Sequence, residues 1–565
     1  MNRQKVLTAT LALGVLLLAP PSAGAQDRAQ GREGIDVVVE APRQVTGNES
    51  PVRLFNIPAL AVHPDDPLTV VMAVGDARNG GCGIRVSRDG GMSWAATAPN
   101  FMPSDLPFCH QRPLFPVMAP AFAPDGTLYV AMPGSSPETG HPNGPISMLV
   151  ARSDDLGETY EVVTVLESER ITVDPAEFGG EGEPEEANTW NKSPSLVVDP
   201  NDPDRLFLGW RWSAWGTDLQ GLSGDVPTRP YVAVSEDGGQ TWSEPTDLVV
   251  SGGDEVYGSS SPMLVIAPDG TLYAFSKESL GPLPALPEGE SPPNPRMLMY
   301  KSTDDGRTWE TSVVQEGGET MRAPQPAVDP RDGDLYVVYG SGGAHASEGE
   351  PPPAPQEIYF ITSQDGGATW SEPVQITRGG EPADKFEPGI SVAPDGRIDV
   401  AWHDFRNDPF GPAQLGRFFR GERYWDVYST FSTDGGATWA PNLRVTETFI
   451  DGGIGATFNN KDVRGPIGIA STEDAAYIAW ADSRASVDRG SPEDAYFSRL
   501  RVGDTEVDVG AVSNSWLWAV LGGGVALALA GLALIMLWFG LRRRQAAAGG
   551  DGHGRPFAEP AAVGH

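Results

Sequence analysis

The sequence predicts an all-β fold, a β-propeller of seven four-stranded antiparallel blades, followed by one C-terminal transmembrane helix. An eight-residue motif with the pattern Ser-x-Asp-x-Gly-x-Ser/Thr-Trp/Tyr occurs six times along the chain. A pair of short apolar segments separated by a turn sequence occurs seven times. Repetition of this kind is typical of propellers and solenoids, in which each unit buries its apolar face against its neighbours. A six-bladed ring is the alternative.

Each position of the repeated motif has a physical role in a tight turn. The Asp carboxylate accepts hydrogen bonds from backbone N–H groups of its own turn, and the Gly adopts a backbone angle that other residues resist. The aromatic ring packs under the turn, and its removal costs roughly 3–5 kcal/mol. We therefore assign a structural role to the six motif aspartates, Asp89, Asp155, Asp237, Asp304, Asp365 and Asp434.

Each pair of apolar segments is interpreted as the first two strands of a blade. The first segment starts near a proline, a turn such as Pro124-Asp125-Gly126 follows in several units, and the second segment is apolar. Pro and Gly mark such turns because Pro presets one backbone angle and Gly permits another. The seven units start near Pro58, Met118, Pro194, Pro262, Pro324, Pro388 and Pro466.

The seventh unit is incomplete. It has a third strand, residues 495–500, but neither the motif nor a fourth strand. Residues 42–46, near the start of the chain, resemble residues 373–377, which occupy a fourth-strand position. We therefore expect the N-terminal segment to close the last blade, with residues 44–45 beside residues 496–497. Closure of this kind removes exposed sheet edges.

Two apolar segments flank the repeated region. The first has the basic start, apolar centre and small-residue cleavage site of a signal peptide. The second is long enough to cross a bilayer as a helix, with a buried core helix as the alternative. The basic residues after it predict a single-pass type I protein of the cell membrane, with its propeller outside the cytoplasm. The expected segments are a signal peptide (1–25), a linker (26–33), the propeller (34–503), a stalk (504–514), a transmembrane helix (515–541) and a cytoplasmic tail (542–565).

The composition excludes one class of partner. The formal net charge is −36, which argues against nucleic acid because phosphates are bound by basic patches. No loop shows the dense carboxylate set of a calcium site, so we assign no metal ligands and predict no cofactor. The only two cysteines, Cys82 and Cys109, lie in or near the first unit. An exported protein can form disulfides, and the sequence leaves open whether these two are joined.

The repeated motif is the Asp box, or BNR repeat, and the chain resembles the sialidase-like β-propellers. The resemblance covers nearly all of the expected exported part. It implies a protein that recognises or hydrolyses glycans, at a site away from the Asp boxes. Sialidases have six blades, so a seven-bladed ring departs from the family.

Long connections gather on one face of the expected propeller, and loops held by a rigid frame usually carry function. The residue two before the first-strand proline faces this side in every unit. Three of these residues are cations, which favour an anion such as a carboxylate as ligand. The alternative is that they pair with carboxylates and only join blades. The seven positions are Asn56, Pro116, Lys192, Ser260, Arg322, Phe386 and Arg464.

The resemblance also nominates site residues. Sialidases hold the sialic acid carboxylate with the Arg of an Arg-Ile-Pro motif. Here Asn56 stands in that place, and an amide cannot make the bidentate charged contact. Arg322 and Arg464 are candidates for the family's arginine clamp. Glu255 and Tyr257 are candidates for its Glu and Tyr nucleophile, which replaces the usual carboxylate in this class of glycosidase.

An Asp-x-Arg sequence recurs at the end of the second strand in three units. Repetition at the same place indicates a structural ion pair. Asp404 is nevertheless the aspartate that we nominate as catalytic, and Arg406 is a candidate for ligand binding. The three sequences are Asp76-Ala77-Arg78, Asp404-Phe405-Arg406 and Asp482-Ser483-Arg484.

The expected function is glycan recognition by a surface-anchored propeller, with acidic sugars as the first ligands to test and hydrolysis as its catalytic form. The alternative, from another class, is a non-catalytic propeller that binds or assembles envelope proteins. Asn56 favours the alternative, whereas the cations Lys192, Arg322 and Arg464 favour the first function.

Overall fold

The computed structural model describes residues 28–30, 36–46, 55–76, 81–97, 101–106, 109, 117–135, 145–174, 184–215, 228–249, 258–279, 296–316, 321, 324–342, 355–379, 383–409, 424–451, 467–485 and 493–503. By its internal contacts the chain divides into two parts, residues 1–503 and 504–565, and all described residues belong to the first. This part is all-β, and no helix occurs among its described residues. The expected signal peptide, stalk, transmembrane helix and tail lie outside the described residues and stay predictions.

None of the described residues forms a helix that is long and apolar enough to span a membrane.

Seven antiparallel units make up the described sheets, and we number them 1 to 7 in chain order. Their first strands are β4 (Phe55–His63), β8 (Ala119–Phe122), β13 (Glu185–Asp199), β18 (Met263–Ile266), β22 (Gln325–Val328), β26 (Lys385–Val392) and β31 (Gly468–Ser471). Each pairs with a second strand, β5 (Asp66–Asp76), β9 (Leu128–Ser135), β14 (Asp202–Trp215), β19 (Leu272–Ser279), β23 (Leu335–Ser341), β27 (Ile398–Asp404) or β32 (Ala475–Asp482). These are the seven pairs that the sequence predicts.

The outer strands of the units follow the same order. The third strands are β6 (Gly81–Ser87), β10 (Ile146–Ser153), β15 (Thr228–Ser235), β20 (Arg296–Ser302), β24 (Glu357–Ser363), β28 (Tyr424–Ser432) and β33 (Asp494–Val502). The fourth strands of units 1 to 6 are β7 (Ala95–Thr97), β11 (Glu161–Leu166), β16 (Thr246–Asp247), β21 (Glu310–Glu316), β25 (Val374–Gln375) and β29 (Leu443–Arg444). Short additional strands are β1 (Arg28–Gln30), β2 (Asp36–Val39), β3 (Arg43–Gln44), β12 (Arg170–Val173), β17 (Gly258–Ser259) and β30 (Ile450–Asp451).

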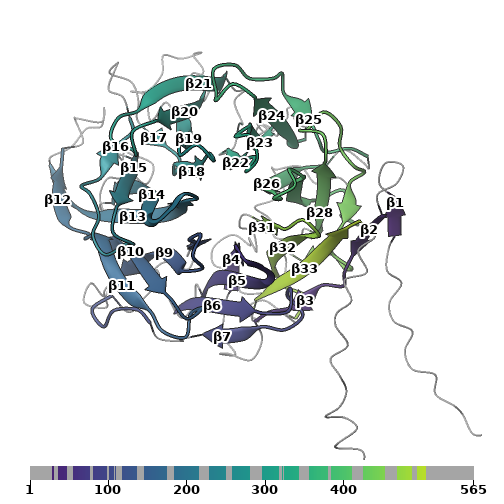
Figure 1. The fold of residues 1–565 in the computed structure, drawn as a ribbon, viewed down its shortest axis with the longest axis horizontal. Coiled ribbons are helices and arrows are strands. Elements are labelled where there is room, and N and C mark those ends of the chain that lie inside the picture. Colours follow the sequence, from purple (N-terminus) through teal and green to yellow (C-terminus); the bar gives the residue numbers. More distant parts are fainter. Residues whose placement is uncertain are drawn as a thin grey trace, which may run out of the picture. The chain divides into compact units, whose positions relative to one another are not determined.

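The first strands contact one another in a closed cycle. The order of contact is β4, β8, β13, β18, β22, β26 and β31, and β31 contacts β4 again. Figure 1 shows the sheets arranged around this ring, with the chain running once around it.

The core lies between neighbouring units, in seven buried clusters among the described residues. Alternate residues of a strand point to opposite faces, so one second strand serves two clusters. In β5, Val70 and Met72 pack against unit 7, whereas Val71 and Ala73 pack against unit 2. Burial on both faces explains why the middle of each second strand is mostly apolar.

The N-terminal segment closes the ring, as the sequence predicts. Strand β2 pairs with β33 through Val37–Val502 and its neighbours, and β3 pairs with β33 through Gln44–Tyr496. The backbone N–H of Val45 donates to the carbonyl of Ala495 at 2.8 Å. The first and last described strands of the ring therefore share one sheet (Figure 1).

All six Asp boxes have the predicted turn geometry. In the box of unit 5, the Asp365 carboxylate accepts hydrogen bonds from the Thr369 backbone N–H at 2.8 Å and the Thr369 hydroxyl at 2.6 Å. Gly367 has a φ of 86° and its N–H donates to Ser363. The aromatic ring of unit 6, Trp439, is buried, whereas the rings of the other five boxes are half-buried.

A disulfide joins Cys82 and Cys109, which answers the question that the sequence leaves open. Cys109 is fully buried in the cluster between units 1 and 2. The bond ties the crossing segment between these units to strand β6.

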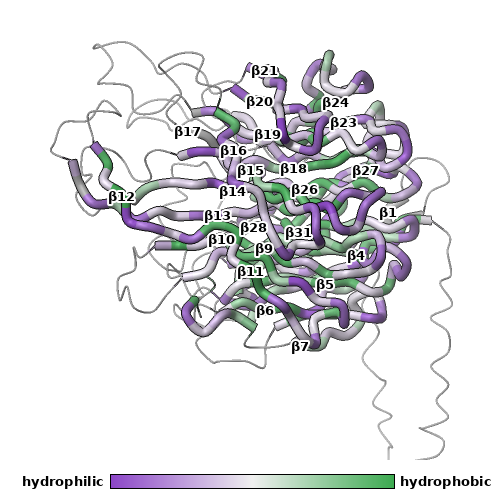
Figure 2. The backbone as a smooth tube through the Cα atoms, turned by 60° about the vertical axis from the view of Figure 1, so that its left-hand side comes forward, coloured by the Kyte–Doolittle hydropathy of each residue, from purple (hydrophilic) through white to green (hydrophobic). Residues whose placement is uncertain are grey.

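Unit 3 carries an extension of its sheet. Strands β13 and β14 have 15 and 14 residues, and β12 pairs with the start of β13. Val173, Ala187 and Ala214 form a small buried cluster of their own there. Figure 2 shows β12 and the adjoining ends of these two strands projecting beyond the other sheets.

Candidate functional site

The first and second strands of each unit are antiparallel, so the start of the first strand lies beside the end of the second. These strand ends lie together at one edge of the ring. Two of the predicted ligand-binding residues, Asn56 and Lys192, lie here with the nominated Asp404. The cross-strand pairs at this edge are Asn56 with Gly75, Lys192 with Arg211, and Lys385 with Asp404.

The first strands of units 1, 3 and 6 bulge at this edge. Their ladders shift register between Asn56 and Ala59, Lys192 and Ser195, and Phe386 and Gly389. The residue before the strand proline has a left-handed backbone in each, with φ of 50° at Ile57, 55° at Ser193 and 48° at Glu387. We call this edge the bulged rim.

The bulged rim is locally strained. A left-handed backbone costs a non-glycine residue roughly 1–2 kcal/mol, and a residue before proline normally stays extended. Bulges re-aim side chains and are over-represented beside active sites, and backbone strain gathers at functional sites. Three independent strands share the distortion, so the bulged rim is the candidate site.

Unit 3 presents a cationic pair on the bulged rim. Lys192 and Arg211 are direct cross-strand partners in β13 and β14, so their side chains leave the same face of the sheet. The Lys192 ammonium lies 4.3 Å from the centre of the Trp190 ring. The pair therefore places two positive charges on one face of the sheet at the bulged rim.

Unit 6 also has a cation on the bulged rim, Lys385. Lys385 is buried, and its Nζ lies 2.8 Å from Glu357 Oε1 in unit 5. The neighbouring Asp384 accepts a hydrogen bond of 2.9 Å from the backbone N–H of Gln356. Lys385, which is not one of the seven aligned positions, therefore joins two units.

The predicted Asp-x-Arg ion pair is confirmed in unit 6. Asp404 is fully buried and accepts hydrogen bonds from Trp402 Nε1 at 2.8 Å and from Arg406 Nη2 at 2.6 Å. Burial by itself lowers the pKa of Arg406, but its hydrogen bonds and charge attraction to Asp404 raise that pKa above its usual value. The Arg406 guanidinium also lies 4.2 Å from the centre of the Tyr428 ring.

The same module recurs in unit 7. Asp482 is buried, accepts from Trp480 Nε1 at 2.9 Å and pairs with Arg484 at 2.7 Å. Arg484 lies 4.5 Å from the centre of the Tyr496 ring. Repetition of three contacts in two units indicates a structural element, and the catalytic role of Asp404 and the ligand-binding role of Arg406 stay predictions. Asp76 lies at the end of β5, whereas Arg78 lies outside the described residues.

Four of the nominated residues cannot be placed. Glu255, Tyr257, Arg322 and Arg464 lie outside the described residues, so the Tyr–Glu pair and the arginine clamp stay predictions. Asn56 lies in β4 opposite Gly75. In the part of the chain that is described, no three His, Cys, Asp or Glu side chains form a group that could hold a metal ion.

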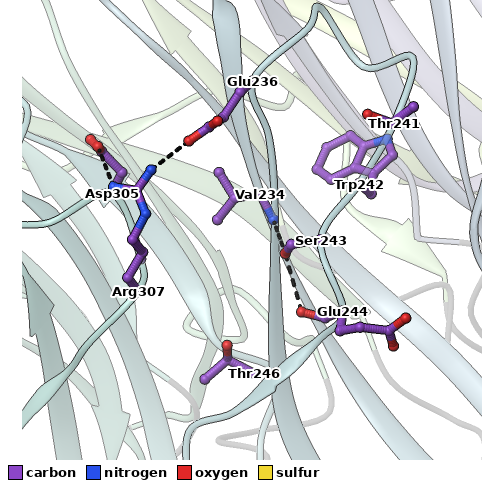
Figure 3. Close-up of a pocket in the computed structure, with 10 residues that line it drawn as sticks. Val234, Glu236, Thr241, Trp242, Ser243, Glu244, Thr246, Asp305 and Arg307 are labelled. Carbon is purple, nitrogen blue, oxygen red and sulfur yellow. Dashed lines mark hydrogen bonds and ion pairs between the residues drawn. The ribbon is translucent and has the colours of Figure 1, made fainter.

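A groove opens on the opposite, Asp-box edge of the ring, between units 3 and 4. Its volume is about 580 Å³, and Trp242 lines it together with Glu236 and Glu244 of unit 3 and with Asp305 and Arg307 of unit 4. Figure 3 shows Trp242 on one side of the groove and the Arg307–Glu236 ion pair on the other. A second groove of about 540 Å³ lies in the equivalent place between units 1 and 2.

Comparison with known proteins agrees with these repeats. Residues 183–379 match the model of the BNR repeat-like domain, a span that contains the Asp boxes of units 3, 4 and 5. A sialidase of Micromonospora viridifaciens is 32% identical over 147 residues, which cover 24% of this chain and 22% of that protein. These two matches support a sialidase-like BNR-repeat family for this chain. The match spans about a fifth of the length of that curated relative.

Solved structures of similar proteins include two sialidase-family enzymes. The Hadza microbial sialidase Hz136 has a TM-score of 0.41 and 15% identity, with 77% of this chain and 74% of that chain covered. The leech intramolecular trans-sialidase, complexed with 2,7-anhydro-Neu5Ac, has a TM-score of 0.41 and 11% identity, with 73% and 79% covered.

Arg211 and Trp190 are rim residues that the sequence analysis missed. The available signal was the alternation Trp210-Arg211-Trp212, in which a charged residue stands between two tryptophans of the second strand. From the sequence alone, a charge at this position indicates only an interruption of the apolar core. Its place on the rim becomes apparent when the register with β13 is known. That register places Arg211 opposite Lys192.

Proposed function

We propose that residues 34–503 form a seven-bladed β-propeller that binds acidic glycans at its bulged rim. The seven hairpins, the seven inter-unit clusters and the closed cycle of first strands support the blade number. The relative matched over 147 residues is named a sialidase, so sialic acid is the first acidic sugar to test.

The pairing of Lys192 with Arg211 carries the proposal. Two cations on one sheet face suit a carboxylate, since guanidinium and ammonium groups make short charged hydrogen bonds to it. Trp190 below Lys192 adds an aromatic surface beside the charges, and the β12–β14 extension rises from the same end of unit 3. The formal net charge of the chain is −36, so the rest of its surface attracts anions only weakly. A local cationic pair therefore directs an anionic ligand to one place.

We also propose that the propeller is exported and anchored by a C-terminal helix at residues 515–541, with its binding face outside the cytoplasm. The apolar N-terminal segment and the arginines after residue 541 support this orientation. Protease added to intact cells should digest the propeller and spare a tag placed after residue 565. A protected propeller contradicts the orientation.

A glycan array read with the purified full-length chain tests the binding proposal. Sialylated or uronic-acid glycans should bind, and enzymatic removal of the acidic sugar should abolish the signal. The Lys192→Ala/Arg211→Ala variant should lose this binding without a change in thermal stability. Equal binding to acidic glycans and their neutral counterparts contradicts the proposal.

A second candidate is a propeller that binds glycans or envelope proteins without hydrolysis. Asn56 in place of an arginine, and the use of Lys385 and Arg406 in ion pairs, favour it. Release of fluorophore from a fluorogenic sialoside separates the two functions. Turnover that survives purification and is lost in Tyr257→Phe establishes hydrolysis, whereas binding without turnover establishes the non-catalytic function.

A further inference from the structure

We propose that the groove between units 3 and 4 binds one ring of a neutral sugar, as a second glycan site on the Asp-box edge. Its volume of about 580 Å³ lies in the range of small-molecule sites. It is lined by one tryptophan and several hydrogen-bonding side chains (Figure 3). This inference goes beyond the acidic-glycan function of the bulged rim and does not depend on it.

Trp242 provides a fixed aromatic wall. One side of the ring packs against the buried cluster between units 2 and 3, and its Nε1 donates to the carbonyl of Gly239 at 3.2 Å. The rest of the ring lines the groove. A ring held in this way presents apolar surface without a further loss of side-chain freedom, which suits the C–H face of a pyranose.

The opposite wall supplies donors and acceptors together. Arg307 pairs with Glu236 at 2.6 Å and with Asp305 at 3.0 Å, so it bridges the two units. The side chains of Arg307 and Glu236 are 60% and 61% exposed, and an exposed pair of this kind contributes little to stability. Its remaining N–H groups and lone pairs therefore face a ligand whose hydroxyls both donate and accept.

The charges of the groove favour a neutral ligand. A carboxylate placed here meets Glu236, Glu244 and Asp305, so the anionic sugars that suit the bulged rim are repelled. A cation must compete with Arg307 for Glu236 and Asp305. A neutral sugar meets neither cost and uses the carboxylates as hydrogen-bond acceptors.

The equivalent groove between units 1 and 2 provides an internal comparison. It keeps a tryptophan, Trp94, but Ala95 and Ala96 line it where Ser243 and Glu244 line the first groove, and Leu156 replaces Asp305. The Asp-box edge thus repeats the groove and its two charged positions, with Arg88 and Glu158 where the first groove has Glu236 and Arg307. The first groove differs by the added polar side chains Ser243, Glu244 and Asp305.

The chain also offers a matched control for mutagenesis. The sequence Trp242-Ser243-Glu244-Pro245 of unit 3 recurs as residues 370–373 of unit 5. Both serines make the same contacts, since Ser243 and Ser371 each accept a hydrogen bond of 3.1 Å from the preceding strand. At the Arg307 position, however, the next box has Ala437. Glu372→Ala therefore repeats the local change of Glu244→Ala without the arginine.

The experiment is a neutral-oligosaccharide array with the full-length chain, followed by titration calorimetry with the strongest binder. Glu244→Ala and Arg307→Ala should each weaken that binding at least fivefold, and Glu372→Ala should leave it unchanged. Lys192→Ala/Arg211→Ala should also leave it unchanged, which separates this site from the bulged rim. Affinity should be the same at low and high salt, since a neutral ligand is not screened. Absence of neutral binders, equal losses in Glu244→Ala and Glu372→Ala, or displacement of the sugar by oligolysine overturns the proposal.

Discussion

Thr46 donates a hydrogen bond of 2.8 Å to Asp494, a residue 448 positions later in the chain. The same hydroxyl accepts a hydrogen bond of 3.0 Å from the backbone N–H of Ala495. Both contacts are buried, and Gln44 adds a third bond from the same segment to Asp494 at 2.8 Å. The closure of the ring is therefore fixed by side chains as well as by strand pairing.

Thr46→Ala should destabilise the ring at its closure. The change leaves a buried carboxylate and a buried N–H with fewer partners, which costs about 1–3 kcal/mol. Urea unfolding measures the loss. Thr172→Ala, which removes an exposed threonine bond to Glu186, is the control and should change stability by less than about 0.5 kcal/mol. Equal effects of the two variants contradict a structural role for the closure.

Loss of the disulfide should lower stability. The bond encloses a sequence separation of 27 residues, for which the loop-entropy relation gives about 3–4 kcal/mol. Cys82→Ser/Cys109→Ser should therefore unfold at lower urea than the oxidised chain. A reductant should lower the midpoint of the wild type and leave that of the double variant unchanged. A variant as stable as the oxidised chain shows that the crossing segment needs no covalent tie.

The Asp boxes should make stability depend on pH in the acid range. Hydrogen bonds from the Thr369 side chain and backbone lower the pKa of Asp365 to about 2, whereas an unfolded Asp has a pKa of about 3.9. A depressed folded-state pKa contributes stability above the unfolded value, and this contribution is lost as pH falls through about 4 toward 2. The unfolding midpoint of Asp365→Asn should accordingly fall less than that of the wild type over this window. Parallel curves refute the assignment.

Asp404 and Asp482 occupy the same module in two units, so comparing their variants distinguishes a structural role from a catalytic one. Replacing either by Asn breaks a buried ion pair, at a cost of about 3–5 kcal/mol. If the module is purely structural, Asp404→Asn and Asp482→Asn should lower stability alike and leave the activity per folded molecule unchanged. Loss of sialoside turnover in Asp404→Asn alone, measured on folded protein, would restore its nominated catalytic role.

Lys192 should contribute to acidic-glycan affinity through its charge. Lys192→Ala should weaken binding about tenfold or more and reduce its dependence on salt, because a charged hydrogen bond is lost. The matched control is Lys301→Ala, since this lysine also lies over an aromatic ring, 5.6 Å from the centre of Tyr273. Its loss should leave affinity unchanged. Binding measured by calorimetry at two salt concentrations decides between the two outcomes.

The repeated architecture could be predicted because its signals are local. Pro124-Asp125-Gly126 forms its turn from three adjacent residues, and Ser363 bonds to Asp365 and Gly367 within one box. The six Asp boxes and the seven pairs of apolar segments order the strands without knowledge of long-range contacts. Strand β25 is shorter than its sequence indicates, with Val374–Gln375 alone in the ladder, although the next residue, Ile376, is buried and its N–H donates to the carbonyl of Ile358.

The bulged rim could not be predicted in the same way. A residue before proline is expected to be extended, yet Ile57, Ser193 and Glu387 are left-handed. The resulting register shift decides which side chains meet across the ladder, and one residue of shift reverses the face. Lys192 could be predicted as a rim cation because it stands two residues before Pro194 in the sequence. Its cross-strand partner Arg211 could not be predicted, because identifying it requires the pairing across the sheet.

The placement of β2 and β3 has a consequence for biosynthesis. These strands are made first, but their partner β33 ends at Val502. The N-terminal segment must therefore remain without its sheet while almost the entire ring emerges from the ribosome, and premature translational arrest before β33 leaves an open edge. Nascent chains stalled within unit 7 should thus depend on chaperones more strongly than chains released after residue 503.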